Sequence, residues 1–299
     1  MSAIPESELV INPDGSVYHL NLRPEEIAST IITVGDPGRV AMVSKYFDEI
    51  EVQKQKREFL THTGRLGKQR LTVISSGIGT ENIDILINEL DALANIDFAS
   101  RTIKDTHQTL EFIRIGTSGA LHEEIPVGAF VASAYGVGLD NLLAFYALQT
   151  NMGEAELTDA LRDFFDLVGP IPFYACQGSP ELLQLMGDAM QETGITMTSP
   201  GFYAPQGREL RLKAKYPAAY FQQLARFQFQ QLRITNFEME TSAIYGLSRL
   251  LGHRALSTNV ILANRASQRF STDPKAQTDA LIQVVLEKLA ARSTVDGNT

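Results

Sequence analysis

The segment Leu110–Gly119 reads LEFIRIGTSG. Its first half is an apolar run typical of a buried strand, Arg114 stands near the end of that run, and the residues GTSG predict a turn. A buried guanidinium needs a partner, and arginine is suited to bidentate recognition of phosphate or carboxylate. The segment therefore predicts an anion site at a strand end. The alternative is an arginine that reaches solvent or pairs with a structural carboxylate.

A second strand-to-turn junction supports the anion site. Ile31–Val34 predicts another buried strand, and Gly35-Asp36-Pro37-Gly38-Arg39 follows it, ahead of a helical sequence at 40–47. Asp36 can cap that helix with Pro37 at its first position. Two strand ends, each with glycines and an arginine, favour a phosphate site at the carboxyl ends of sheet strands.

Composition predicts a folded protein and excludes several classes. The chain has 299 residues, of which 44% are hydrophobic, and no linker divides it, so residues 1–299 are expected to form one domain with tails at 1–15 and 293–299. A net charge of −9 argues against a nucleic-acid partner, whose backbone requires a basic face.

Metal, disulfide and membrane chemistry are also not expected. Cys176 is the single cysteine, and the five histidines (His19, His62, His107, His122 and His253) lack the spacing of metal ligands. No window is long and apolar enough to cross a bilayer, and residues 1–8 do not resemble a signal peptide. We therefore expect a cytoplasmic protein with no metal site and no membrane partner.

Strand and helix patterns alternate along the chain, which predicts the α/β class. Strands are expected at Ile31–Val34, Leu71–Ser75, Phe112–Gly116, Ala129–Ala134, Phe173–Cys176 and Thr258–Ala263. Amphipathic helices are expected at Glu81–Ala94 and Ala280–Ala291. The polar stretch Asp97–Gln108 predicts a surface insertion.

Two glutamates stand close together in the sequence Thr235–Leu247. Thr235 and Glu238 have the spacing of a capping box, which predicts that Glu238 closes a helix start. Glu240 aligns at helical spacing with apolar residues, including Ile244 and Leu247, which would place a carboxylate on a buried face. We interpret Glu240 as an acceptor for a sugar diol. The alternative is an ion pair with a core arginine such as Arg114 or Arg249.

The segment Gly201–Arg208 combines an aromatic ring, an amide and a guanidinium. Phe202 could stack on a planar base while Gln206 and Arg208 read its edge. An ordinary loop is the alternative. Asn264-Arg265 closes a predicted strand, where ligands tend to bind, although a simple turn explains it equally well.

In this order the motifs resemble the nucleoside phosphorylase-I family, and within it the uridine phosphorylases. The resemblance covers nearly the whole chain. It rests on SVYHL at 16–20, GDPGR at 35–39, REF at 57–59, IRIGTSG at 113–119, FEME at 237–240 and ANR at 263–265. Each motif is short, but their common register is specific.

The resemblance implies a role for each matching residue. The phosphate ligands would be Gly35, Arg39, Arg114 and Thr117, with Arg57 contributed by a partner subunit. The ribose ligands would be Arg114, Glu238, Met239 and Glu240, with His19 contributed by a partner subunit. The base would contact Phe202, Gln206, Arg208, Leu262 and Ala263. The catalytic set within these groups would be Arg39, Arg114, Thr117, Glu240, Gln206 and Arg208.

The resemblance also implies a fold and an assembly. The expected fold is a three-layer α/β/α domain with a mixed, partly barrel-like sheet, and the active sites would be shared across a dimer, alone or within a hexamer. Three features depart from the family pattern. Ala204-Pro205 replaces the usual Pro-Gly before Gln206, and the 97–108 insertion is long. Asn82 stands where bacterial members carry a serine that helps to bind an interfacial potassium ion. The resemblance therefore leaves open whether this chain binds that ion.

The implied reaction is reversible phosphorolysis of uridine to uracil and α-ribose 1-phosphate, a pentosyltransferase activity of pyrimidine salvage. Deoxyuridine and thymidine are further candidate substrates. Phosphate is a co-substrate, and no cofactor is expected. The alternatives are a purine nucleoside phosphorylase, a nucleosidase that uses water, and a catalytically idle nucleoside-binding protein. Asn264 argues against a purine nucleoside phosphorylase, because related purine enzymes usually carry a proton-donating aspartic acid at this position. Arg39 and Arg114 argue against a nucleosidase, because the related nucleosidases lack these arginines.

Overall fold

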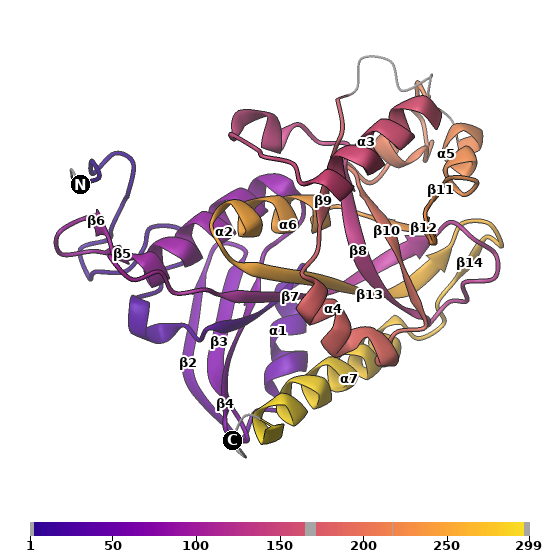
Figure 1. The fold of residues 1–299 in the computed structure, drawn as a ribbon. Coiled ribbons are helices and arrows are strands. Elements are labelled where there is room, and N and C mark those ends of the chain that lie inside the picture. The colour runs from indigo at the N-terminus through magenta and orange to yellow at the C-terminus, as the bar shows by residue number, and fades with distance from the viewer. Residues whose placement is uncertain (1–2, 165–171, 217, 296–299) are drawn as a thin grey trace.

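A computed structural model describes residues 3–164, 172–216 and 218–295 (Figure 1). Its main sheet has twelve strands, and ten of them follow the order β11-β12-β10-β8-β13-β7-β1-β4-β3-β2. The remaining two, β9 and β14, pair with β8 and β13. The strands are β1 (Thr30–Val34), β2 (Glu49–Lys56), β3 (Phe59–Leu66), β4 (Gln69–Ser75), β7 (Glu111–Ala120), β8 (Phe130–Gly138), β9 (Tyr174–Gln177), β10 (Glu192–Thr198), β11 (Gln228–Phe229), β12 (Leu232–Glu238), β13 (Arg254–Asn264) and β14 (Arg269–Phe270).

Part of this sheet closes on itself. Strands β7, β13, β8, β10 and β12 follow one another, and β12 also pairs with β7 through Phe237 and Gly119. The β7–β13 and β10–β12 pairs are parallel, whereas β8–β13 and β7–β12 are antiparallel. The predicted mixed, partly barrel-like sheet is therefore confirmed, whereas the assignment of 1–299 to one domain stays a prediction.

Helices cover the sheet on both sides, as Figure 1 shows. On one side α6 packs on the barrel strands and α2 packs on α6. On the other side α1 and α4 both contact α7, which itself packs on β7 and β13. The helices are α1 (Pro37–Ser44), α2 (Thr80–Asn95), α3 (Met152–Phe164), α4 (Pro180–Met186), α5 (Ala218–Leu224), α6 (Thr241–Leu250) and α7 (Pro274–Val295).

The amphipathic helices form where the sequence predicts them. In α2 the predicted apolar stripe is fully buried, from Ile83 to Leu93. In α7, Leu281, Val285 and Leu289 are buried against the opposite core. Asp36 caps α1, since its Oδ1 accepts a hydrogen bond from Gly38 N at 2.8 Å. Burial of these stripes on both faces of the sheet gives the three layers.

The predicted turn at Gly116–Gly119 is wrong, because β7 continues through it to Ala120. Gly116, Thr117 and Ser118 pair with consecutive residues of β13, and Gly119 pairs with both β13 and β12. The ladder hydrogen bonds of the barrel outweigh the local turn preference of glycine and serine.

Part of the N-terminal stretch 3–15, which the sequence assigns to a tail, contacts the rest of the molecule. Arg101 donates hydrogen bonds to the carbonyls of Ile4, Pro5 and Leu9, and Leu9 is buried. Arg101 lies in the predicted insertion, which is on the surface but contains a small hairpin of β5 (Ile96–Asp97) and β6 (Thr102–Ile103). At the other end α7 extends to Val295, so the predicted tail at 293–299 begins inside a helix, and 296–299 lie outside the described residues.

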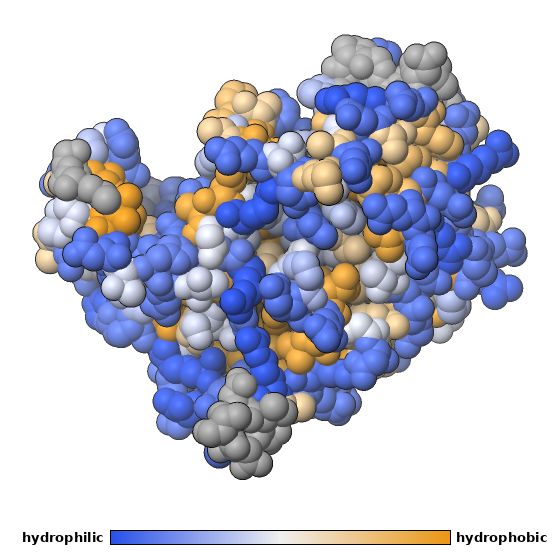
Figure 2. Space-filling view, viewed as in Figure 1, coloured by the Kyte–Doolittle hydropathy of each residue, from blue (hydrophilic) through white to orange (hydrophobic). Residues whose placement is uncertain are grey.

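The visible face of the molecule is largely hydrophilic, with smaller apolar patches between polar side chains (Figure 2). None of the helices in the described part of the chain combines the length and apolarity needed to cross a membrane.

Candidate active site

One cavity of about 700 Å³ brings together residues from eight separate segments of the chain. Its lining includes twelve of the residues that the sequence assigns to a site: Gly35, Arg39, Arg114, Thr117, Phe202, Gln206, Arg208, Glu238, Met239, Glu240, Leu262 and Ala263. These come from the turn after β1, from β7, from the loop after β10, from the end of β12 and from β13. The closed barrel and its loops therefore bring the predicted residues together.

Arg114 is the buried centre of the cavity wall. Its Nη1 donates to Asn259 Oδ1 at 2.8 Å, and its Nη2 donates to Glu240 Oε2 at 2.5 Å. The same Nη2 lies 3.3 Å from Glu238 Oε2. A β-carbon on Gly116 would stand 1.7 Å from Arg114 Nη1, so the guanidinium can lie along β7 only because residue 116 is glycine.

The charges around Arg114 are strongly coupled. Burial alone would lower the pKa of Arg114, but the carboxylates of Glu238 and Glu240 raise it above its ordinary value. Burial and the charge of Glu240 raise the pKa of Glu238, while Arg114 opposes that shift. The three side chains thus depend on one another for compensation of their buried charges.

Glu238 caps α6, as predicted, but by a different arrangement. Its Oε2 accepts hydrogen bonds from Glu240 N and Thr241 N, both at 2.9 Å, and its Oε1 accepts from Thr198 Oγ1 at 2.6 Å. The capping box with Thr235 is wrong, because Thr235 and Glu238 both belong to β12 and the helix begins only at Thr241.

The prediction that Glu240 lies on the apolar stripe of a helix is also wrong. Glu240 is the N-cap residue of α6, and its carboxylate does not accept a hydrogen bond from that helix. Instead Oε2 pairs with Arg114, which is the ion pair that the sequence left open, and Oε1 accepts from Gly79 N at 2.8 Å. Glu240 still lines the cavity, so the ion pair and a ligand role are compatible.

Arg39 gives the cavity a second cation near Arg114. Its Nη1 donates to the carbonyl of Ile115 at 3.1 Å, and within the described part of the chain no carboxylate forms an ion pair with it. Burial and the charge of Arg114 lower the pKa of Arg39 to about 10. A partly desolvated cation without a carboxylate partner, beside the buried Arg114, is suited to binding an anion between the two guanidinium groups.

The other end of the cavity has an aromatic and amide character. The guanidinium of Arg208 lies over the Phe202 ring, 3.8 Å from its centroid, and its Nη1 donates to Gln206 Oε1 at 2.6 Å. Gln206 is buried, with its Nε2 3.2 Å from the carbonyl of Gly201. This arrangement holds a flat cation, an amide and an exposed ring on one turn of the chain.

The side chains of Asn264 and Arg265 contact different parts of the molecule. The Asn264 amide donates to the carbonyls of His122 and Ile125, both at 2.7 Å, so it ties β13 to a loop and does not line the cavity. Arg265 donates to the backbone carbonyl of Gln206, and its guanidinium lies 5.5 Å from the centroid of the Phe237 ring. Burial and the nearby Arg208 lower the pKa of Arg265 to about 10.

The two residues assigned to a partner subunit lie outside this cavity. His19 is held by Glu89, with 2.5 Å between Nδ1 and Oε1, and its side chain is about one third exposed. Arg57 lies at the turn between β2 and β3 with a φ of 54°, next to Glu58, which does line the cavity. Neither placement tests a contribution to another subunit.

Several residues that line the cavity have no predicted role in binding or catalysis. They are Asp36, Pro37, Glu58, Gly77, Ile78, Asn82, Ser118, Gly119, Phe237 and Phe270. Most of them are neighbours of predicted residues, but Gly77 and Ile78 precede α2 and Phe270 belongs to the short strand β14. Only the pairing of β14 with β13, which places Phe270 opposite Ala263, brings that ring to the cavity.

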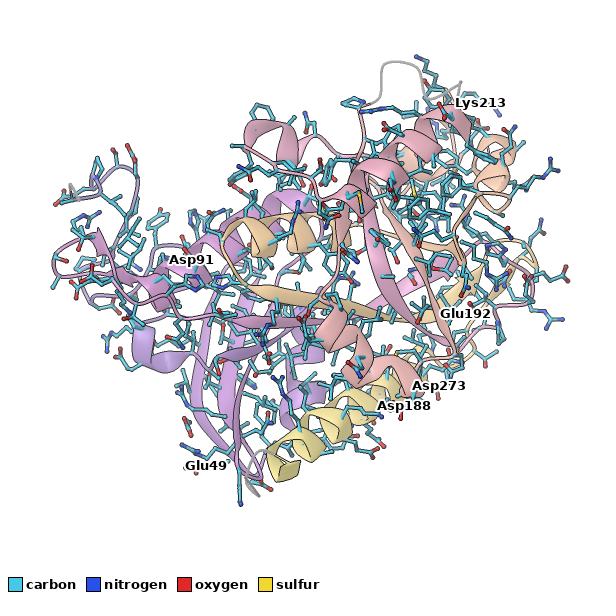
Figure 3. The ribbon with its side chains drawn as sticks, viewed as in Figure 1. Glu49, Asp91, Asp188, Glu192, Lys213 and Asp273 are labelled. Carbon is cyan, nitrogen blue, oxygen red and sulfur yellow. The ribbon has the colours of Figure 1, made fainter. Side chains whose placement is uncertain are left out.

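Two histidines that are far apart in the sequence lie together in space. His107 and His253 stack with 5.4 Å between ring centroids, and both approach Asp91 on α2 (labelled in Figure 3). His253 Nδ1 accepts a hydrogen bond from Leu110 N, which assigns the ring proton to Nε2, 3.2 Å from Asp91 Oδ1. In this tautomer His253 offers no free lone pair to a metal ion.

Comparisons with known proteins show which proteins this chain is similar to. Uridine phosphorylase from Thermococcus kodakarensis is 29% identical over 86% of this chain and 80% of its own length, and that from Haemophilus influenzae is 29% identical over 90% and 96%. A crystal structure of a Trypanosoma brucei nucleoside phosphorylase, which shows uridine phosphorylase activity, superposes with a TM-score of 0.87. It is 29% identical and covers 95% of this chain and 99% of its own. The family model of the phosphorylase superfamily matches residues 29–294, and the chain therefore belongs to that superfamily.

Proposed function

We propose that this protein is a uridine phosphorylase, which converts uridine and phosphate reversibly into uracil and α-ribose 1-phosphate. The observation that carries the proposal is the cavity itself, in which two arginines, a buried glutamate and the Phe202–Arg208 turn line one continuous space. The names and activity of the relatives support the same substrate. Deoxyuridine and thymidine are secondary candidate substrates.

The phosphate would bind between Arg39 and Arg114, with Gly35 and Thr117 beside it. The glycosidic bond breaks through a state with positive charge on the ribose, and a phosphate held below C1′ stabilises that charge before it attacks. Phosphate binding would also compensate the burial and the charge of Arg114, which together lower the pKa of Arg39. Inorganic phosphate is the co-substrate, and the proposed reaction uses no other cofactor.

The ribose would lie across Met239 and Glu240, with its 2′- and 3′-hydroxyls on the Glu240 carboxylate. Glu238 lines the same wall, but both of its carboxylate oxygens already accept hydrogen bonds, from Thr198 and from the first amides of α6, so we assign it to positioning the wall. The base would lie beside Phe202, Leu262 and Ala263. As the bond to C1′ lengthens, negative charge builds on uracil, and donors from Gln206 and Arg208 would stabilise it.

A shared dimeric site is part of the proposal. His19 would meet the 5′-hydroxyl, and Arg57 the phosphate, in the site of a partner subunit, within a dimer or a hexamer. The position of Arg57 supports this proposal, because Arg57 is next to Glu58, which lines the cavity. A second subunit packed against this part of the surface could bring its own cavity within reach of Arg57. We also propose a cytoplasmic location, in keeping with the lone, buried Cys176.

A nucleoside panel tests the proposal directly. Uridine, 2′-deoxyuridine, thymidine, inosine and adenosine are incubated with the protein, with and without phosphate, and free base is quantified. We expect phosphate-dependent release of uracil from uridine. Preferred cleavage of inosine or adenosine would overturn the substrate, and cleavage without phosphate would overturn the reaction.

A further inference from the structure

Glu240 does not cap the helix that it precedes. The first amides of α6 are taken by Glu238, and the Glu240 carboxylate turns across the cavity wall to α2. There its Oε1 accepts a hydrogen bond from the backbone N–H of Gly79, 161 residues away in sequence. Gly79 is the N-cap residue of α2, a helix of 16 residues, and the positive end of a helix dipole favours an ionised carboxylate.

The backbone at Gly79 is restricted to glycine. Its φ of 102° and ψ of 160° lie in a region that residues with a side chain essentially do not occupy. A β-carbon there would also stand 2.9 Å from Glu81 Oε2. The glycine thus allows the chain to turn into α2 while its N–H points at Glu240.

Two hydrogen-bond donors in the protein occupy part of the acceptor capacity of the Glu240 carboxylate. Each carboxylate oxygen has two acceptor sites. Gly79 N occupies one on Oε1 and Arg114 Nη2 occupies one on Oε2. One site stays open on each oxygen, and Glu240 lines the cavity while being only 4% exposed. Two adjacent hydroxyls, each donating to one oxygen, match that remaining capacity.

We propose that Gly79 is a positioning residue for nucleoside recognition, whose amide orients the Glu240 carboxylate to accept the two hydroxyls of the ribose. This inference rests on the proposed function. It implies that Gly79 contributes to the preference for ribosides over 2′-deoxyribosides although it does not itself contact the sugar.

The test compares Gly79→Ala with Gly67→Ala. Gly67 also has a positive φ, of 58°, but lies in the turn between β3 and β4, with open space where a β-carbon would go. We expect Gly79→Ala to lower kcat/KM for uridine by about tenfold to 100-fold, the range for a lost hydrogen bond to a charged group. The loss for 2′-deoxyuridine should be smaller, and KM for phosphate should not change. Gly67→Ala should match the parent for both substrates.

A double variant separates positioning from a general structural effect. If Gly79 acts through Glu240, adding Gly79→Ala to Glu240→Gln should change uridine turnover less than about threefold. Should Gly79→Ala not fold, Glu240→Asp replaces it, since the shorter side chain cannot reach Gly79 N and Arg114 together. It should show the same riboside-selective loss.

The outcomes distinguish two failures. A parent protein that releases uracil, combined with equal losses for uridine and 2′-deoxyuridine or with independent, multiplying losses in the double variant, would overturn this inference alone. A parent protein that releases no uracil from uridine would overturn the proposed function and this inference together.

Discussion

Arg114 and Glu240 form a buried ion pair, 2.5 Å between Nη2 and Oε2, that joins the middle of β7 to the start of α6 across 126 residues of sequence. Each side chain is about 6% exposed. The pair therefore belongs both to the fold and to the candidate site. Arg39, in contrast, lines the same cavity without a carboxylate partner among the described residues.

This difference predicts unequal effects on stability. Arg114→Ala would leave Glu238 and Glu240 buried without their cation and should lower the free energy of unfolding by about 3–5 kcal/mol. Arg39→Ala should lower it by less than about 1 kcal/mol, because Arg39 neutralises no buried carboxylate. Denaturant unfolding of both variants measures the two values. Equal losses of stability would contradict the assignment of Arg114 to the fold.

Phosphate should stabilise the parent protein against heat. An anion between Arg39 and Arg114 would offset the burial and the charge of Arg114 that lower the pKa of Arg39. At 100 times its dissociation constant a ligand adds about 2.7 kcal/mol to the folded state. Melting curves with and without phosphate measure the shift, with chloride of equal ionic strength as the control. Arg39→Ala should abolish most of the shift, and an unchanged shift in that variant would place phosphate elsewhere.

The base preference should depend on Gln206. A site built to hydrogen-bond a base edge rejects a base that leaves those groups unpaired by as much as about 10⁴-fold, so uridine should be strongly preferred to inosine. Gln206→Ala should erode this preference mainly by lowering kcat/KM for uridine. Gln223→Ala, on the exposed side of α5, is the matched control. A preference that survives in Gln206→Ala would remove Gln206 from base recognition.

Mixed subunits should recover activity if sites are shared. Arg39→Ala and Arg57→Ala should each be inactive alone, but a hybrid dimer contains one site with both defects and one with neither. Turnover after subunit exchange, confirmed by differently labelled subunits, measures the recovery. Exchange without recovered turnover would show that Arg57 does not serve the partner's site.

Local sequence signals predicted much of the fold and many of the residues that line the cavity. The apolar stripe of α2 and the Asp36 cap need only neighbouring residues, and both are confirmed. The glycine-rich and arginine-containing junctions also contain residues that line the cavity, among them Arg39 and Arg114. These features depend on helical periodicity and on chemistry within a few residues of the chain.

Long-range pairing explains the failures. The Thr235–Glu238 spacing fits a capping box, but β12 pairs with β10, where Glu238 lies opposite Thr198, and this keeps both residues in a strand. Gly116–Gly119 has turn chemistry, but its pairing with β13 extends β7. The contact between Gly79 and Glu240 likewise depends on the packing of α2 beside α6, for which the sequence carries no local signal.

The stoichiometry of one reaction distinguishes phosphorolysis of uridine from hydrolysis. The purified protein is incubated with uridine and inorganic phosphate, and uracil, consumed phosphate and ribose 1-phosphate are each quantified over time. For a uridine phosphorylase we expect the three amounts to be equal throughout, and no uracil to form when phosphate is left out. Uracil accompanied by free ribose, or formed at the same rate without phosphate, would contradict this expectation.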